Sequence, residues 1–132
     1  MNEPLKLSSR ARGRIENLGL EFLARFYAAE TRRRPRNVAA LAELGHVLTQ
    51  LERYEDGLAV DRQLARLVPD NPTARYNLAC SLALVGLAEE ALDELDRAVD
   101  LGYDDVEHLV ADTDLASLHE ERRFRALVER LR

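Results

Sequence analysis

An internal period of 34 residues constrains the fold of this chain more than any other feature of its sequence. Leu44 is followed at this interval by Leu78, and the polar residue Asn37 is followed by Asn71. Further pairs at the same interval are Leu48 and Leu82, Leu58 and Leu92, Pro35 and Pro69, and Glu55 and Glu89. A fixed period of about 20 to 50 residues is typical of repeat architectures. The chain is therefore expected to stack similar units.

Within one period, the apolar spacing predicts two helices joined by a tight turn. Leu78, Leu82 and Val85 fall on one helical face at i, i+4 and i+7. Gly86 is expected to end that helix, because glycine adopts positive φ without a Cβ penalty. A second apolar stripe follows it. The predicted helices cover residues 38–51 and 54–68 in the first unit, and residues 73–85 and 88–101 in the second.

Residues 37–103 resemble the tetratricopeptide repeat family, whose unit is a helix–turn–helix of 34 residues. The resemblance is carried by the period together with Leu41-x-x-Leu44-Gly45-x-x-Leu48 in the first unit and Leu78-Ala79-x-x-Leu82 in the second. The chain also departs from the family pattern. No Trp opens either unit, Asp61 stands where a bulky aromatic residue is usual, and Tyr103 replaces the closing proline.

The resemblance implies an all-α fold: a right-handed superhelix of two helical hairpins, with an amino-terminal helix and a carboxyl-terminal helical cap. We expect one domain over residues 1–132. Its segments would be a capping helix over 8–35, the first repeat over 37–70, the second repeat over 71–103 and the cap over 104–132.

Two segments outside the repeats are expected to cover the ends of the array. An amino-terminal helix should run from Ser8 or Ser9 to about Arg33. It should pack through an apolar stripe formed by Ile15, Leu18, Phe22, Phe26 and Ala29 and widened by Leu23 and Tyr27. After a short helix over 106–111, opened by Asp105, a carboxyl-terminal tail should fold over Ala91, Leu95 and Val99. Its covering residues would be Leu115, Leu118, Phe124, Leu127 and Leu131.

Charge is shared unevenly along the chain. The net charge is −5, but residues 1–36 hold nine Lys and Arg against four Glu, whereas residues 37–132 hold ten Arg against twenty Asp and Glu. Such asymmetry is typical of a solvated helix with favourable charges at its end, and also of a basic arm that meets an acidic surface. The basic run Arg32–Arg36 lacks interleaved aromatic residues, and the acidic remainder would repel phosphates, so we expect no nucleic-acid partner.

The sequence gives no indication of a membrane or secretory protein. It contains no apolar run long enough to span a bilayer, and its amino terminus lacks an apolar signal core. The single cysteine, Cys80, is consistent with a reducing compartment. We therefore expect a cytoplasmic protein without a membrane partner.

No motif of a known catalytic or cofactor site is present, including phosphate-binding loops, CxxC and HExxH. Cys80 has no base beside it that would activate a nucleophile. His108, Asp112 and Asp114 could contact a metal, which gives the rival prediction of an enzyme or metal protein. Two acidic residues near one histidine are more typical of a helix terminus, so we expect no enzyme, no metal and no cofactor.

In tetratricopeptide arrays, the first helix of each pair lines a concave groove that holds peptide segments of partners. The resemblance therefore predicts partner binding by Glu43, His46, Gln50, Thr73, Tyr76, Asn77 and Cys80. Asn77 matches the asparagine with which chaperone-binding relatives contact a peptide backbone or terminal carboxylate. The basic residues of that carboxylate clamp are absent, because their places are taken by Ala42, His46, Glu107 and Ala111.

These observations favour a non-catalytic adaptor that binds a neutral or basic peptide segment of a partner protein. The alternative is a self-assembly module, such as a homodimer, in which the basic amino-terminal helix of one copy meets the acidic face of another.

Overall fold

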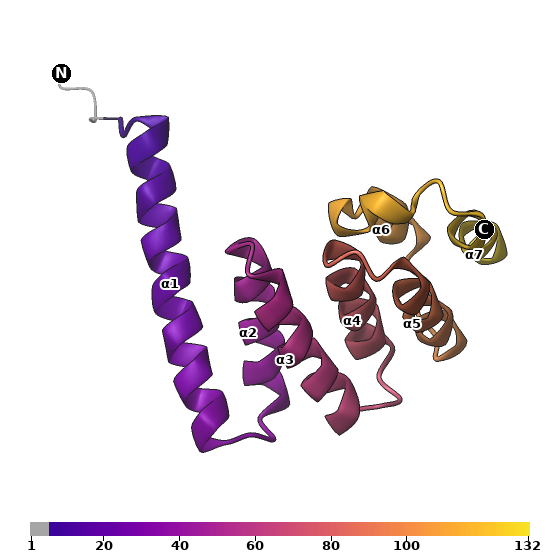
Figure 1. Ribbon diagram of the computed structural model, residues 1–132, viewed down its shortest axis with the longest axis horizontal. Helices are drawn as coiled ribbons and strands as arrows, with labels where there is room; N and C mark the ends of the chain where they lie inside the picture. The colour runs from indigo at the N-terminus through magenta and orange to yellow at the C-terminus, as the bar shows by residue number, and fades with distance from the viewer. Residues whose placement is uncertain (1–5) are drawn as a thin grey trace.

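The computed structural model describes residues 6–132, nearly all of them in helices or in short turns between helices (Figure 1). The elements are α1 (Ser9–Arg33), α2 (Val38–Gln50), α3 (Tyr54–Leu67), α4 (Pro72–Leu84), α5 (Ala88–Asp100), α6 (Val106–Ala111), the 3-10 helix η1 (Thr113–Leu118) and α7 (Arg122–Leu131). Residues 6–132 contain no β-strand, so the all-α class is confirmed. Residues 1–5, which belong to the predicted domain, lie outside the described residues.

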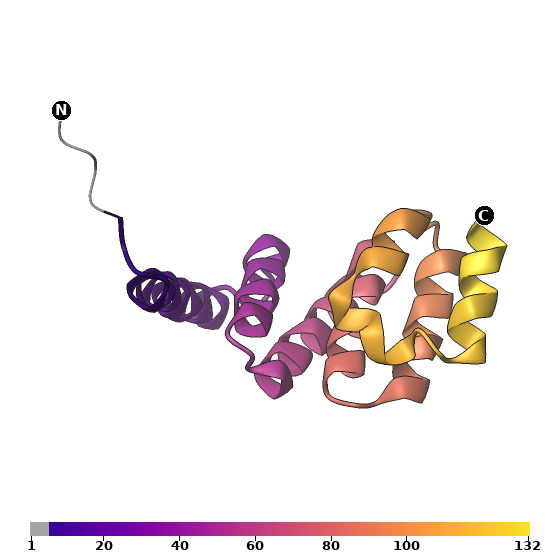
Figure 2. The same ribbon diagram turned by 90° about the horizontal axis from the view of Figure 1, so that it is seen from above.

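Consecutive helices pack against one another in pairs. α2 packs on α3, and α4 packs on α5, while α3 and α4 join the two hairpins. The molecule is elongated, with α1 at one end and α7 at the other (Figures 1 and 2). The predicted helices are confirmed to within one residue at each end. Within residues 6–132, no helix is both long and apolar enough to cross a membrane.

The polar residues that repeat in the sequence have the same structural role in both hairpins. Asn37 and Asn71 are the N-cap residues of α2 and α4. Each side-chain oxygen accepts a hydrogen bond of 3.1 Å from the backbone N–H three residues later. These bonds satisfy amide groups that have no partner within the helix.

The turn inside each hairpin also recurs at the 34-residue interval. Glu52 and Gly86 both adopt a left-handed backbone conformation, with φ of 60° and 88°. Directly after them, the backbone N–H groups of Arg53 and Leu87 each donate a hydrogen bond of 2.9 Å to a carbonyl five residues earlier. The sequence predicted this conformation at Gly86. At Glu52 the same conformation is held by a residue with a Cβ, which carries a steric cost.

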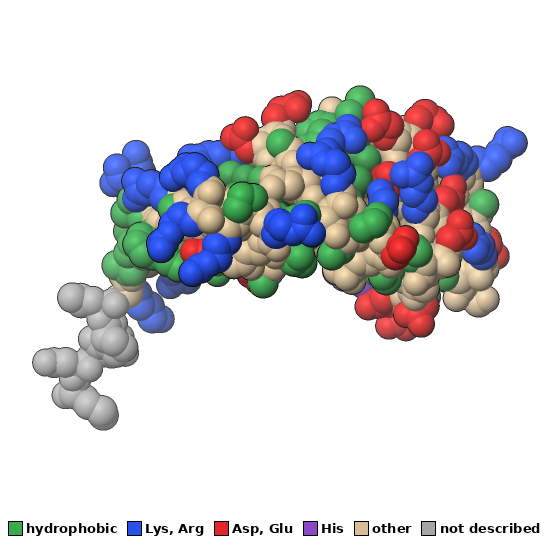
Figure 3. Space-filling model, turned by 90° about the horizontal axis from the view of Figure 1, so that it is seen from below, with side chains coloured by type: hydrophobic (Ala, Val, Ile, Leu, Met, Phe, Trp, Pro, Cys, Tyr) green, Lys and Arg blue, Asp and Glu red, His purple; other side chains and the backbone are tan. Residues whose placement is uncertain are grey.

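The amino-terminal helix packs on α2 mainly with a different face from the one expected, and the two faces share only Tyr27 at the edge of the predicted stripe. Ile15, Leu18, Phe22 and Phe26 are 53%, 69%, 62% and 55% exposed, so the prediction that their stripe forms the packing face is wrong. The less exposed side of α1 carries Leu20, Ala24, Tyr27, Ala28 and Thr31. Small residues on this side allow the two helix backbones to approach closely. Figure 3 shows hydrophobic side chains beside Lys and Arg side chains at the α1 end of the molecule.

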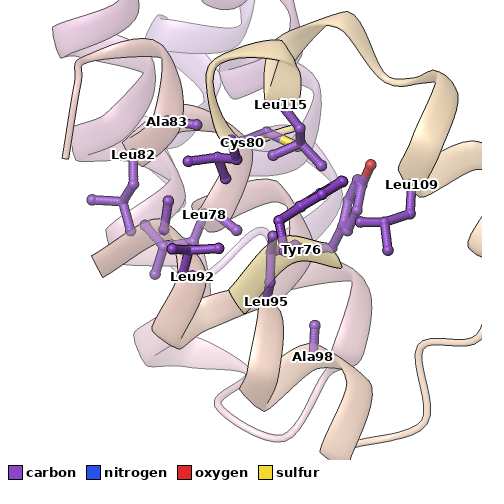
Figure 4. Close-up of a cluster of buried hydrophobic side chains, with 14 of the residues drawn as sticks. Tyr76, Leu78, Cys80, Leu82, Ala83, Leu92, Leu95, Ala98, Leu109 and Leu115 are labelled. Carbon is purple, nitrogen blue, oxygen red and sulfur yellow. The ribbon is translucent and has the colours of Figure 1, made fainter. Parts of the chain in front are cut away.

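The main hydrophobic core lies between the second hairpin and the carboxyl-terminal segment (Figure 4). Leu78 and Leu92 are 4% and 2% exposed, which confirms their expected burial. The expected covering of α5 is also confirmed, because the tail residues pack in one cluster with Ala91 and Leu95. These tail residues are Leu115, Leu118, Phe124 and Leu127. Leu131 of the tail and Val99 of α5 are partly buried and pack against the same cluster. Asp105 caps α6 as predicted, accepting a hydrogen bond of 3.1 Å from the His108 N–H.

The two equivalent turns predict opposite effects of substitution. Gly86→Ala is expected to lower the free energy of unfolding by about 1 kcal/mol, because a Cβ is strained in the left-handed region. No atom lies within 4 Å of that Cβ position, so the effect would come from the backbone alone. Glu52→Gly is expected to raise the free energy of unfolding by about 0.5–1 kcal/mol.

Urea denaturation of the purified variants measures both changes. Glu52→Ala is the control, because it removes the carboxylate and keeps the strained backbone. If Glu52→Ala stabilises the chain as much as Glu52→Gly does, the effect belongs to the charge of Glu52 and not to its conformation.

Candidate functional site

A cavity of about 280 Å³ opens between α2, α4 and the corner that joins α6 to η1. Asp61, Asp112 and Asp114 supply three carboxyl groups to its wall, and His46 and His108 supply two imidazole rings. Among the described residues, no Lys or Arg lines the cavity. The wall is therefore acidic, with histidine as its only basic side chain.

Four of the seven predicted partner-binding residues line this cavity: His46, Tyr76, Asn77 and Cys80. Glu43, Gln50 and Thr73 are exposed and lie outside its lining. The structure thus divides the predicted set into a cavity group and a surface group. Partner binding by either group stays a prediction.

Tyr76 is placed differently from what the sequence suggested. Its side chain is only 4% exposed and belongs to the buried cluster that includes Leu109 and Leu115 (Figure 4). Its ring stacks on that of Tyr103, with centroids 4.4 Å apart and planes 6° from parallel. Tyr76 was expected to line an open groove, but its ring leaves almost no surface exposed to a partner. Tyr76 is buried by tertiary packing, because the carboxyl-terminal segment covers its ring.

Asp112 is the centre of the polar contacts in the cavity wall. Its Oδ2 atom accepts a hydrogen bond of 2.6 Å from the Tyr76 hydroxyl and lies 3.6 Å from the Cys80 sulfur. Its Oδ1 atom accepts a bond of 3.0 Å from the Asp114 N–H and thereby caps η1. His108 Nε2 lies 3.5 Å from Oδ2. One carboxylate thus joins α4 to both elements of the corner.

The cysteine in this cluster is not set up as a nucleophile. Burial, together with the carboxylates of Asp112 and Asp114, raises the pKa of the Cys80 thiol. A reactive cysteine needs the opposite shift, because the thiolate is the nucleophile. The thiol of Cys80 therefore acts in this site as a weak hydrogen-bond donor.

The residues of the rival metal-site prediction lie close to one another. Ligand atoms of Cys80, Asp112 and Asp114 are within 4.8 Å of each other, and His108 contacts Asp112. Cys80 was not expected in this set from the sequence. Metal binding by the thiol would require it to lose its proton, which its raised pKa opposes. The observed contacts are hydrogen bonds from Cys80 and Asp114 to Asp112, and the approach of His108 to the same carboxylate.

Asp61 is the site residue that the sequence analysis missed. Its side chain is only 5% exposed, and its Oδ2 atom accepts a hydrogen bond from the Ser81 hydroxyl of α4. A Cβ at position 45 would lie 2.5 Å from Asp61 Oδ1, so Gly45 provides the room for this carboxyl. Its signal in the sequence was a charged residue within the apolar stripe of α3, between Leu58 and Leu64.

Burial raises the pKa of Asp61 from its ordinary value of 3.8 to about 6, although the bond from Ser81 lowers it. Ionised Asp61 is therefore less favourable in the folded chain than in water.

The comparison with known proteins adds no functional information, because no family model and no curated protein matches the chain.

Asp61→Asn is expected to stabilise the chain at neutral pH. Below pH 3.8 Asp61 is protonated in both the folded and the unfolded state, so folding carries no free-energy penalty for burying an ionised carboxylate. As the pH rises to about 6, the unfolded state loses its proton first, so the folded state becomes relatively less stable. Above that pH the penalty is complete. Removing it should raise the free energy of unfolding at pH 7 by about 1–3 kcal/mol.

Urea denaturation of the wild type and the variant between pH 4 and pH 8 measures this difference. Asp70→Asn is the matched control, because Asp70 is exposed. The stabilisation by Asp61→Asn should grow as the pH rises, whereas Asp70→Asn should show no such trend. A gain that is the same at every pH would contradict the assigned pKa.

Proposed function

We propose that the chain is a non-catalytic peptide-binding module of the tetratricopeptide type, and that its acidic cavity receives a cationic side chain of a partner protein. The observation that carries this proposal is the buried carboxyl of Asp61. Burial raises the pKa of this carboxyl and so disfavours its ionised form, yet it lies in the wall of a cavity that a ligand could enter. An ionisable group that lies in a cleft and has a strongly shifted pKa is typical of a functional site.

The tetratricopeptide assignment is supported by the agreement between sequence period and local structure. Two helical hairpins share N-cap residues, turn conformation and closing hydrogen bonds at an interval of 34 residues. The first helices of the two hairpins, α2 and α4, both contribute residues to the cavity. In this family the first helices form the surface that holds partner peptides.

The chemistry of the wall supports a basic ligand. Three carboxyl groups surround a space that no Lys or Arg among the described residues enters. A lysine or arginine side chain would gain charge-assisted hydrogen bonds there, which are stronger than bonds between neutral groups. Asn77, also in the wall, can donate and accept hydrogen bonds and suits the backbone of an extended peptide.

The state of the cavity cysteine supports a non-catalytic role. The raised pKa of Cys80 holds its thiol in the form that does not attack electrophiles. Asp112, the carboxylate closest to it, already accepts hydrogen bonds from Tyr76 and Asp114. These groups form a fixed surface for recognition.

The test is a titration of the isotope-labelled chain with a short blocked glycine–serine peptide that contains one central lysine. Amide signals of His46, Asn77 and Asp114 are expected to shift. Asp112→Asn should weaken binding about five- to tenfold, because it removes a charge while keeping the acceptor that caps η1. Added salt should weaken binding as well.

The same peptide with its lysine acetylated tests the charge, and it should cause no shifts. Glu43→Gln is the control variant, because Glu43 is exposed on α2 outside the cavity lining. If Glu43→Gln weakens binding as much as Asp112→Asn does, the site is the wider surface of α2 and not the cavity. Equal binding of both peptides would refute a cationic ligand.

A further inference from the structure

The amino-terminal helix exposes a row of large apolar side chains that no other described element covers. This row, the outer face, consists of Ile15, Leu18, Phe22 and Phe26, each more than half exposed. Successive residues of a helix are about 100° apart, so the outer face lies roughly opposite Ala24, the buried residue of α1. Packing on α2 therefore leaves the outer face free along about three turns of the helix.

Three exposed arginines follow one border of the outer face. At about 100° per residue, Arg14, Arg25 and Arg32 fall on the same side of the helix, roughly 80° from the centre of the apolar row. Figure 3 shows Lys and Arg side chains beside hydrophobic ones at this end of the molecule. Arg12 falls near the opposite border and Arg33 near the centre of the row, so the outer face combines apolar surface with positive charge. The surface that complements it is both apolar and anionic.

A second copy of the chain does not provide this complement. In an antiparallel pair of α1 helices related by a two-fold axis, each border of one helix meets the same border of its partner. The row of Arg14, Arg25 and Arg32 would then face itself, and like charges at such borders are destabilising. The arginines along this border therefore oppose self-association through the outer face.

The shape of the molecule favours a flat surface. α1 has 25 residues and lies at one end, with its outer side turned away from the other helices (Figures 1 and 2). A plane could contact the whole helix, of roughly 37 Å, without meeting the rest of the chain. The acidic part, with a net charge of −10 over residues 37–132, extends away from α1.

We propose that the outer face of α1 docks on a lipid bilayer that contains anionic lipids. A helix with an apolar face and arginines beside it lies in the plane of the bilayer, with its apolar side chains in the acyl boundary and its cations among the headgroups. This proposal revises the expectation of no membrane partner, which rested on the absence of a spanning segment. It does not depend on the cavity, whose lining residues lie outside α1.

The test is co-sedimentation of the full chain with vesicles of phosphatidylcholine alone and with added phosphatidylglycerol. Binding is expected only with phosphatidylglycerol and should weaken with salt. Leu18→Ser with Phe22→Ser should weaken binding at least about tenfold, because it removes the two most exposed side chains of the outer face. Arg14→Gln with Arg25→Gln should weaken it about fivefold or more.

Two control variants match these changes elsewhere on the molecule. Leu87→Ser with Leu101→Ser alters leucines that are 40% and 37% exposed, and Arg66→Gln with Arg122→Gln removes two exposed arginines. Both controls should bind vesicles like the wild type. Circular dichroism and urea denaturation of each variant establish that it remains folded, and the lysine-peptide titration should be unchanged in the outer-face variants.

Three results would overturn the proposal. One is no binding to either vesicle, or equal binding to both. Another is vesicle binding that the outer-face variants leave intact. The third is a concentration-dependent dimer, or a complex with an acidic protein, that the Leu18 and Phe22 substitutions abolish while vesicles are not bound.

Discussion

Burial of the outer side of the second hairpin by the carboxyl-terminal segment is the packing interaction on which the rest of the structure depends. In a row of stacked helices, each helix presents an apolar side that only the next element can cover. α4 and α5 bury theirs under η1 and α7, with Leu115, Leu118 and Phe124 each at most 4% exposed. The largest buried cluster of the molecule includes this contact and also reaches Leu58 and Ala65 of α3, where the two hairpins meet.

The same contact creates the candidate site. When η1 folds onto α4, its N-cap residue Asp112 meets the hydroxyl of Tyr76, and the corner between α6 and η1 closes one side of the cavity. The opposite side is formed by α2, where Gly45 lets Asp61 approach from α3. The cavity therefore depends on two packing contacts, η1 on α4 and α3 on α2. Its acidic character arises because the first contact brings Asp112 and Asp114, and the second brings Asp61, to the same space.

The two ends of the molecule differ in how their terminal helices are covered. At the carboxyl-terminal end, α7 covers α5, and Arg123 contacts Asp93 and Asp96 at 2.9 and 2.7 Å. At the amino-terminal end, α1 covers α2 but is itself left uncovered by the described residues. An apolar surface of this size on a helix is typical of an interaction site. The α1 end therefore has a physical reason to meet another surface, whereas the α7 end has none of comparable size.

The sequence by itself determined the helices, their ends and their pairing. These features depend on local interactions: Asn37 and Asn71 accept bonds from amides three residues away, and Gly86 adopts a conformation that its missing Cβ allows. The covering role of the tail was also predictable, because its apolar residues have no other partner nearby in the chain.

Only the tertiary structure decided which side chains are open to solvent. α1 has apolar residues on two sides, and its sequence pattern does not state which side meets α2; close approach through Ala24 and Ala28 settled it. Tyr76 was assigned to an open groove, but Tyr103, Leu109 and Leu115 from a later segment of the chain cover it. Asp61 gained its raised pKa from burial between helices that are separate in the sequence. Exposure and pKa depend on every neighbour in space, and helical periodicity describes only the neighbours along one helix.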